Sequence, residues 1–286
     1  MRMVTRLTPA GIGMLICALA VSISMLAGCA NGVGHIEPQP GLAEDLLPAE
    51  ADAQAEAVRR DPLGYIREVA ARCGELEQYT LRFTRYERRG LFQRMYGPER
   101  ISCWFRQQPF SVRMKWLDED IKYFESAYVE GWESNKVRFV TRWWSPPLAA
   151  PPAVNKVGLQ APVIWGEAKR PFTDFGLERL MQRTLDSVSK AGRDVVVTYE
   201  GLLQLPQTGS TAHHLHLAYS EDIKRVPIQE LYIDVATGMP VGTILKFASG
   251  RIDAAYFYAD LNTDVTLTDE DFLLQAERDA REREGR

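Results

Sequence analysis

The chain has 286 residues, of which 45% are hydrophobic and 25% are charged, and its formal net charge is −4. This composition is typical of a folded protein with a sizeable core and argues against intrinsic disorder. A mildly acidic chain lacks the concentrated basic surface that nucleic-acid binding requires, so we expect no nucleic-acid partner. The length suits one large all-β or α+β domain.

The N-terminus carries a short apolar segment that is preceded by Arg2 and Arg6. Residues 12–26 are the length of a signal-peptide core, and they are too few for a membrane-spanning helix. The segment closes on the sequence Leu26-Ala27-Gly28-Cys29. Small residues before a cysteine predict a lipobox, although an ordinary secretory signal with a chance cysteine is the alternative.

This segment resembles the signal of bacterial lipoproteins, in which the bond before the cysteine is cleaved and the cysteine is acylated. The resemblance implies removal of residues 1–28, which takes the net charge to −6 because only two arginines are lost. It also implies that Cys29 carries several acyl chains such as palmitate, enough for stable membrane anchoring. The non-acidic Ala30 implies the periplasmic face of the outer membrane.

Four segments are expected along the chain: the signal peptide over 1–28, a lipidated and disordered tether over 29–58, a folded domain over 59–276, and a charged, frayed tail over 277–286. The tether is rich in Ala, Glu, Gly and Pro and has almost no aromatic residue. Such a segment cannot bury enough apolar surface to order itself.

Helical and strand periodicities alternate through the folded domain. Asp61-Pro62 predicts a capped helix that ends near Gln78, and three-to-four spacing predicts a second helix over 174–190. A capping box at Thr268 and Asp271 predicts a third helix. Period-two alternation predicts strands over 79–83, 99–106, 111–116, 122–130, 136–140, 194–201, 211–219, 228–235, 240–247 and 251–259. Antiparallel neighbours joined by short turns are the simplest arrangement.

After the signal and the lipidated residue, two cysteines remain in an oxidising compartment. Cys73 and Cys103 form one disulfide or are two separately buried thiols, because spacing alone does not show that they meet. Neither belongs to a CxxC pair, so we expect no zinc site from cysteines.

Several short motifs resemble an uncharacterised bacterial family, domain of unknown function 1571. They are the sequences 79–83 (YTLRF), 109–116 (PFSVRMKW), 128–131 (YVEG), 260–261 (DL) and 267–269 (LTD) with Phe272. The element order also resembles the LolA and LolB lipoprotein-carrier superfamily. That resemblance implies an α+β, mainly antiparallel fold, in which a curved open half-barrel sheet is closed by helices and holds acyl chains on its concave face.

An apolar face that alternates through a single curved sheet must be covered by helices or must enclose a ligand. We expect a lipid-binding surface lined by Leu81, Phe83, Val112, Met114, Trp116, Phe124, Tyr128, Leu231, Ile233 and Val235. For any one of these residues, simple core packing is the alternative.

Two further sites are considered. Trp143, Trp144 and Leu148 lie in a Pro-rich stretch and could contact a membrane or a partner, or could fold over the sheet rim. His214 and His216 project to one side of a strand beside His213 and could begin a metal site, but no third ligand is identifiable. We therefore expect no metal and no cofactor.

Other signs of catalysis are missing from the sequence, which has no nucleophile elbow, Walker loop, zinc-protease motif or dinucleotide turn. The strand carboxylates Glu87, Glu99, Glu125 and Glu130 are expected to pair with basic neighbours on a solvated face. We interpret the chain as a monomeric, non-enzymatic lipoprotein that binds lipid, acyl chains or lipidated proteins. The alternatives are an interaction module with a plugged cavity and a metal-dependent enzyme.

Overall fold

The computed structural model describes Ile36 and residues 49–285. Residues 35–286 form one compact unit, and the second unit, residues 1–34, lies outside the described residues. The lipobox and Cys29 therefore also lie outside them. Among the helices of the described residues, none is both long and apolar enough to cross a membrane.

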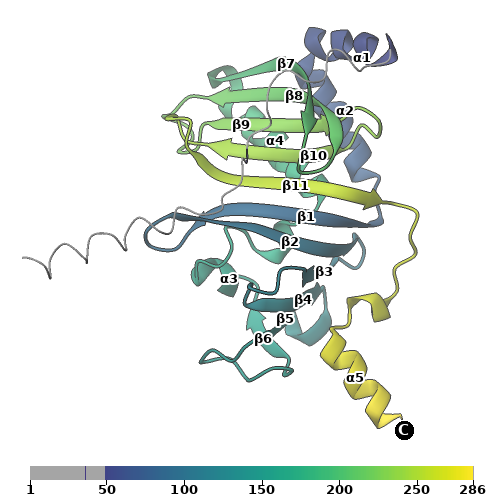
Figure 1. The fold of residues 1–286 in the computed structure, drawn as a ribbon. Helices are drawn as coiled ribbons and strands as arrows, with labels where there is room; N and C mark the ends of the chain where they lie inside the picture. Colours follow the sequence, from purple (N-terminus) through teal and green to yellow (C-terminus); the bar gives the residue numbers. More distant parts are fainter. Residues whose placement is uncertain (1–35, 37–48, 286) are drawn as a thin grey trace, which may run out of the picture. The chain divides into compact units, whose positions relative to one another are not determined.

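Eleven strands in the described part of the chain form one open, curved antiparallel sheet, in the order β6-β5-β4-β3-β2-β1-β11-β10-β9-β8-β7 (Figure 1). The strands are β1 (Gln78–Arg89), β2 (Arg94–Arg106), β3 (Ser111–Trp116), β4 (Tyr123–Val129), β5 (Lys136–Thr141), β6 (Asn155–Gly158), β7 (Val195–Leu205), β8 (Ser210–Tyr219), β9 (Ile228–Asp234), β10 (Pro240–Lys246) and β11 (Ile252–Asn262). The α+β, mainly antiparallel class is confirmed, as are the predicted strands, except that the short β6 was not expected.

Two meanders meet at the centre of the sheet. β1 to β6 form the first and β7 to β11 form the second, and β1 pairs with β11 over Thr80 to Glu87 and Asn262 to Ala254. Side chains on each strand alternate between the two faces, as period two requires. This pairing makes the two meanders one continuous surface.

Two helices cover the second meander on the concave face, α2 (Pro62–Gly74) and α4 (Leu177–Ala191) (Figure 1). As predicted, Asp61 caps α2, because its Oδ1 accepts a hydrogen bond from the Gly64 amide at 2.8 Å. The buried residues of the two helices and the inward residues of the strands form the main core. α2 ends at Gly74, four residues before the predicted end.

α4 begins where its backbone passes close to the sheet. Gly176 has a φ of 122°, and a Cβ there would lie 3.1 Å from the Phe105 ring. The Leu177 amide then donates to the Tyr79 hydroxyl at 3.0 Å. Glycine is therefore required at this junction, both for its φ and for its size.

The N-terminal boundary of the folded domain was predicted incorrectly. Helix α1 (Ala49–Arg60) begins inside the expected tether, and Val58 is buried in the main core. Ile36 is also buried, in a second apolar cluster with Phe257 on the opposite face of the sheet, and its carbonyl accepts from Gln207 Nε2 at 3.0 Å. Val58 and Ile36 thus each add an apolar side chain to a cluster of the folded domain.

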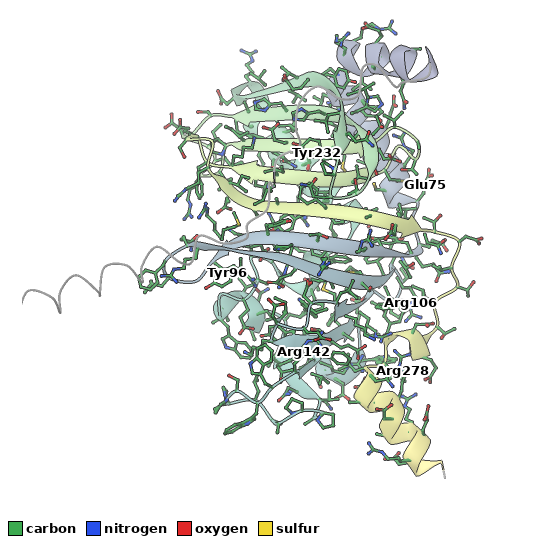
Figure 2. All side chains as sticks on the ribbon, viewed as in Figure 1. Glu75, Tyr96, Arg106, Arg142, Tyr232 and Arg278 are labelled. Carbon is green, nitrogen blue, oxygen red and sulfur yellow. The ribbon has the colours of Figure 1, made fainter. Side chains whose placement is uncertain are left out.

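The C-terminal segment packs on the first meander, on the convex face away from the main core, where Leu274 is buried with Ala127 and Val140. Figure 2 labels Arg278 in this segment. The Thr268–Asp271 capping box is present, but it opens the 3-10 turn Asp269–Phe272, and α5 (Gln275–Glu284) follows. Glu277 belongs to α5 and pairs with Arg138, which is only 2% exposed. The prediction that the chain frays from Glu277 onward was therefore wrong, because α5 continues to Glu284.

Cys73 and Cys103 are both free and buried, so the disulfide expected as one alternative is not formed. The Cys73 thiol faces Met239 Sδ at 4.0 Å, and the Cys103 thiol faces the Ile101 carbonyl at 3.9 Å. Both act as small apolar core residues, and burial raises the pKa of each thiol.

A buried ion pair joins the sheet to the C-terminal segment. Arg113 Nη2 lies 2.5 Å from Glu125 Oε1, and Glu125 is fully buried. Glu125 Oε2 also accepts from the Gln275 amide at 2.7 Å, and Arg113 donates to the Asp271 carbonyl at 3.2 Å.

Glu125→Gln should lower the free energy of unfolding by about 3–5 kcal/mol, because it leaves Arg113 buried without its counter-charge. Urea unfolding followed by tryptophan fluorescence measures this change. The exposed Glu130→Gln, one residue past β4, is the matched control and should stay close to wild type. Equal stability of the two variants would contradict the structural role of the pair.

Candidate functional site

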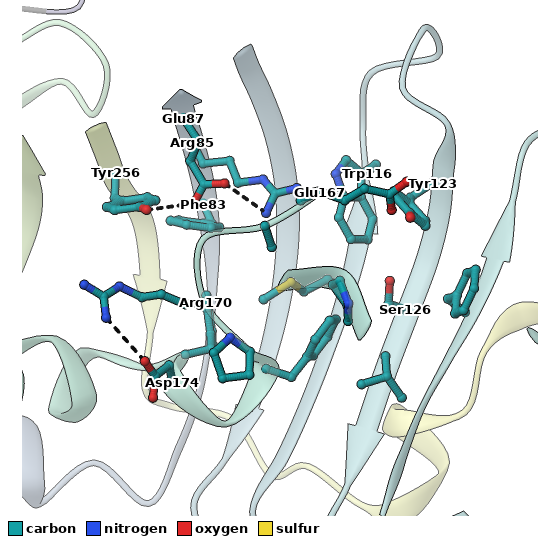
Figure 3. A pocket seen from close by; sticks show the side chains of 18 of the residues that line it. Phe83, Arg85, Glu87, Trp116, Tyr123, Ser126, Glu167, Arg170, Asp174 and Tyr256 are labelled. Carbon is teal, nitrogen blue, oxygen red and sulfur yellow. Dashed lines mark hydrogen bonds and ion pairs between the residues drawn. The ribbon is translucent and has the colours of Figure 1, made fainter. Parts of the chain in front are cut away.

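An apolar cavity lies on the concave face of the first meander, between the sheet and the segment 159–176 (Figure 3). Its volume is about 110 Å³. Its apolar lining comes from both sides: Phe83, Met114, Trp116, Tyr123, Val137, Phe139, Val157 and Tyr258 from the sheet, and Pro162, Trp165, Ala168, Pro171, Phe172 and Phe175 from the covering segment. The geometry is that of a small-molecule site with aromatic walls.

Buried charges close one end of this cavity. Glu99 accepts hydrogen bonds from Arg85 Nη2 at 2.8 Å and from Trp116 Nε1 at 3.0 Å, and it also pairs with Arg89. Burial raises the pKa of Glu99, but the two guanidinium groups and the Trp116 hydrogen bond outweigh it and hold the pKa at about 2. The carboxylate is therefore ionised at neutral pH.

Glu87 lies beside this group and accepts from the Tyr256 hydroxyl at 2.7 Å (Figure 3). Glu87, Glu99 and Glu125 are each no more than 3% exposed. The expectation that these strand carboxylates lie on a solvated face was therefore wrong for all three, and it holds for Glu130 alone. Each buried carboxylate has an arginine or a hydroxyl partner, which is how buried charge is tolerated.

Polar contacts hold the covering segment onto the sheet. The segment contains the short helices α3 (Ala161–Ile164) and η3 (Phe172–Asp174). The Glu167 carbonyl accepts from Arg85 and Arg89, and Lys122 pairs with the Glu167 side chain at 3.0 Å. On the other side, Lys169 pairs with Asp253 of β11 at 2.7 Å.

The structure brings three of the ten predicted lipid-binding residues to this cavity: Phe83, Met114 and Trp116. Leu81, Val112, Leu231 and Ile233 belong to the main core instead. Tyr128 lies in a separate shallow hollow with Phe110 and Glu178. The core alternative thus holds for these four residues.

The two remaining residues of that set were placed wrongly. Phe124 packs on the opposite face, against the Lys115 ammonium and the Ala127 cluster, because a bulge between Tyr123 and Glu125 breaks the alternation of β4. Tyr123 takes its place in the cavity. Val235 lies beyond β9, in a turn.

Sequence reasoning missed most of the cavity wall. Val137 and Phe139 alternate in a strand that was predicted, so continuing the inward face to β5 would have found them. Most of the covering segment has no periodicity, and its only signal was the presence of Trp165 and Phe172 in a stretch with no predicted strand or helix.

The proposed contact loop is partly exposed. Trp143 is 45% exposed and Trp144 is 62% exposed, whereas Leu148 is buried. Leu148 therefore anchors the loop, and the two indole rings face outward. Their contact with a membrane or a partner stays a prediction.

The histidine cluster splits between the two faces of β8. His214 and His216 both bind Glu230 Oε2, at 2.8 and 3.0 Å, so the predicted shared side is confirmed. His213 points into the core and meets the Tyr199 hydroxyl at 3.0 Å. Across residues 49–285, no group of three or more His, Cys, Asp or Glu is placed to hold a metal.

Burial lowers the pKa of His213 to about 4, so its ring is neutral at physiological pH. In the unfolded chain it takes up a proton below about pH 6.5, and in the folded chain only below about pH 4. The stability that the neutral His213 ring contributes is therefore fully present above pH 6.5. It is lost as the pH falls from 6.5 to 4.

Between pH 6.5 and pH 4 the free energy of unfolding of wild type should fall by on the order of 2–3 kcal/mol more than that of His213→Gln. Unfolding free energies of wild type and variant, measured at several pH values, give the two slopes. Between pH 7 and 8 the curves should run parallel, which is the internal control. Identical slopes below pH 6.5 would show that His213 is not the titrating group.

Comparison with solved structures finds several matches, all of low sequence identity. MucB, also matched in its complex with MucA from Pseudomonas aeruginosa, is 16% identical with a TM-score of 0.44; the match covers 77% of this chain and 64% of the MucB chain. This chain thus spans less than two thirds of the MucB length.

Two further matches cover nearly the whole of the other chain. A LolA superfamily protein from Nitrosomonas europaea is 7% identical with a TM-score of 0.33, covering 74% of this chain and 95% of that one. The Mycobacterium tuberculosis lipoprotein LppX is 9% identical with a TM-score of 0.41, covering 73% and 100%.

Sequence comparison is more decisive for the family. No curated protein matches this sequence. The model of the family described as "Protein of unknown function (DUF1571)" matches residues 76–279, which include the whole sheet and both sides of the cavity. The chain therefore belongs to the DUF1571 family.

Proposed function

We propose that this protein is a non-enzymatic lipoprotein, anchored through Cys29 to the periplasmic face of the outer membrane, that binds an acyl chain in the cavity under segment 159–176. The observation that carries the proposal is the aromatic and aliphatic lining of that cavity. Each methylene group transferred from water into such a lining is stabilised by about 0.8 kcal/mol. The ligand would be a lipid or the acyl chain of a lipidated protein.

The cavity must widen to admit such a chain. Its volume of about 110 Å³ is below the several hundred Å³ that is usual for ligand pockets. The covering segment is held by the Lys122–Glu167 pair, by the Lys169–Asp253 pair and by hydrogen bonds from Arg85 and Arg89 to the Glu167 carbonyl. Of these contacts, the Lys122–Glu167 pair is partly solvent-exposed and contributes little to stability, so displacement of the segment from Lys122 is the least costly route to an open cavity.

Ser126 offers a direct test of acyl-chain binding. Its side chain lies on β4 between the apolar walls of the cavity. Ser126→Phe should fill the space and reduce the lipid that co-purifies with the full chain from membranes by about tenfold or more, as measured by extraction and mass spectrometry.

The matched control is Ser102→Phe, because Ser102 lies on β2 opposite Lys115, on the face away from the cavity. This variant should retain wild-type amounts of lipid. A wild-type protein from which no lipid can be extracted would overturn the proposal, and so would equal retention by the two variants.

Cys29→Ser should abolish incorporation of a palmitate analogue and should leave the signal segment uncleaved, because the acylated thiol is lost. Metabolic labelling followed by gel fluorescence and intact-mass measurement tests this. Cys73→Ser removes a thiol that is buried and free, and it should label like wild type. Labelling that persists in Cys29→Ser would contradict the anchor.

A protein-binding module with a filled cavity is the second candidate function. The narrow cavity favours it, and so do large apolar side chains exposed near the covering segment: Leu91, Phe92, Ile164 and Trp165. The same lipid extraction distinguishes the two candidates, because a filled cavity would release no lipid.

A further inference from the structure

A second hollow adjoins the apolar cavity and has the opposite character. It has a volume of about 490 Å³, and it lies between α4, the loop before β9 and the strands β9 to β11. Its charged lining comprises the cations Lys169, Arg170, Arg183, Lys190, Lys224 and Arg225, and the anions Asp186 and Asp253. Six cations face two carboxylates in a chain whose net charge is negative.

Most of these cations have no acidic partner. Lys169 pairs with Asp253, and Arg170 lies 3.4 Å from Asp174. Within the described part of the chain, Arg183, Lys190, Lys224 and Arg225 form no ion pair with a carboxylate. Arg183 instead donates to the Asp174 backbone carbonyl at 2.6 Å.

The positive charges in this hollow also repel one another. Burial lowers the pKa of Arg183 and of Lys224, and the charge of Arg170 lowers both further. An arrangement of like charges that is held together by the fold, at a cost in stability, is typical of a site that an anion completes.

The two hollows share part of their lining. Arg170, Arg183 and Tyr256 border both, so an anionic group in the second hollow would lie next to an apolar chain in the first. Figure 3 shows Arg170 and Tyr256 on the same side of the apolar cavity. The remaining lining of the basic hollow includes the polar side chains of Thr184, Gln229 and Thr243 and the apolar side chains of Leu180 and Leu245.

We infer that the ligand is an anionic single-chain amphiphile, whose phosphate or carboxylate headgroup is bound by Arg170, Arg183, Lys190 and Lys224 while its chain enters the apolar cavity. This inference rests on the proposed acyl-chain binding and adds the charge of the headgroup to it. The basic hollow supplies selectivity, and the apolar cavity supplies most of the affinity.

Native mass spectrometry of the full chain in a non-ionic detergent tests the inference. Palmitoyl lysophosphatidylglycerol and palmitoyl lysophosphatidylcholine share one acyl chain and one phosphate and differ in net charge. Added together at equal concentration, the anionic lipid should give about ten times more adduct than the zwitterionic one. Glycerol 3-phosphate, which lacks the chain, should give none.

Lys190→Gln with Lys224→Gln should bring the ratio of the two adducts close to one. The matched control is Lys115→Gln with Lys136→Gln, which removes the same charge from β3 and β5, away from the basic hollow, and should keep the wild-type ratio. Higher salt should reduce the preference of wild type but not that of the Lys190/Lys224 variant.

The outcomes separate the two proposals. Equal adducts of both lipids on wild type would overturn the headgroup site and leave acyl-chain binding intact. Absence of both lipids would overturn acyl-chain binding itself. A glycerol 3-phosphate adduct as abundant as that of the anionic lipid would show a free-phosphate site and would overturn the amphiphile.

Discussion

The pairing of β1 with β11 is the constraint on which the rest of the structure depends. It joins residues near the start of the folded domain to residues near its end, and without it the two meanders would be separate small sheets. Phe83 and Arg85 of β1 and Tyr256 and Tyr258 of β11 line the apolar cavity, so the cavity is built across this junction. Closing such a long loop is entropically costly, and the stacked rings of Phe83 with Tyr256 and Tyr258 help to offset that cost.

The sheet carries buried charge on both faces, with different consequences. On the convex face, Arg113 and Arg138 hold the C-terminal segment through Glu125, Glu277 and backbone carbonyls. Around the cavity, Arg85 and Arg89 divide their hydrogen bonds between Glu99 and the Glu167 carbonyl of the covering segment. The first set fixes the C-terminal segment to the sheet, whereas the second links the polar end of the cavity directly to the element that covers it.

Local pattern predicted the strands, both covering helices and the Asp61 cap, because alternation and capping are encoded by neighbours in sequence. It did not predict which inward residues pack against a helix and which line the cavity, since that depends on where α2 and α4 lie across the sheet. Leu231 and Phe83 both follow the inward alternation, but Leu231 belongs to the main core and Phe83 lines the cavity. The bulge that turns Phe124 outward and the burial of Glu99 are also tertiary effects. A carboxylate in a strand gives no local sign of whether two arginines surround it.

The arrangement of the two hollows bears on how a ligand could enter. The covering segment supplies Trp165 and Phe172 to the apolar cavity and Lys169 and Arg170 to the basic hollow. Its movement would therefore change both at once. The Lys169–Asp253 pair holds this segment to β11 at the border of the basic hollow, where an arriving anion would compete with Asp253 for the lysine. In the proposed mechanism, headgroup binding would therefore weaken the contact that keeps the apolar cavity closed, so that charge recognition precedes entry of the chain.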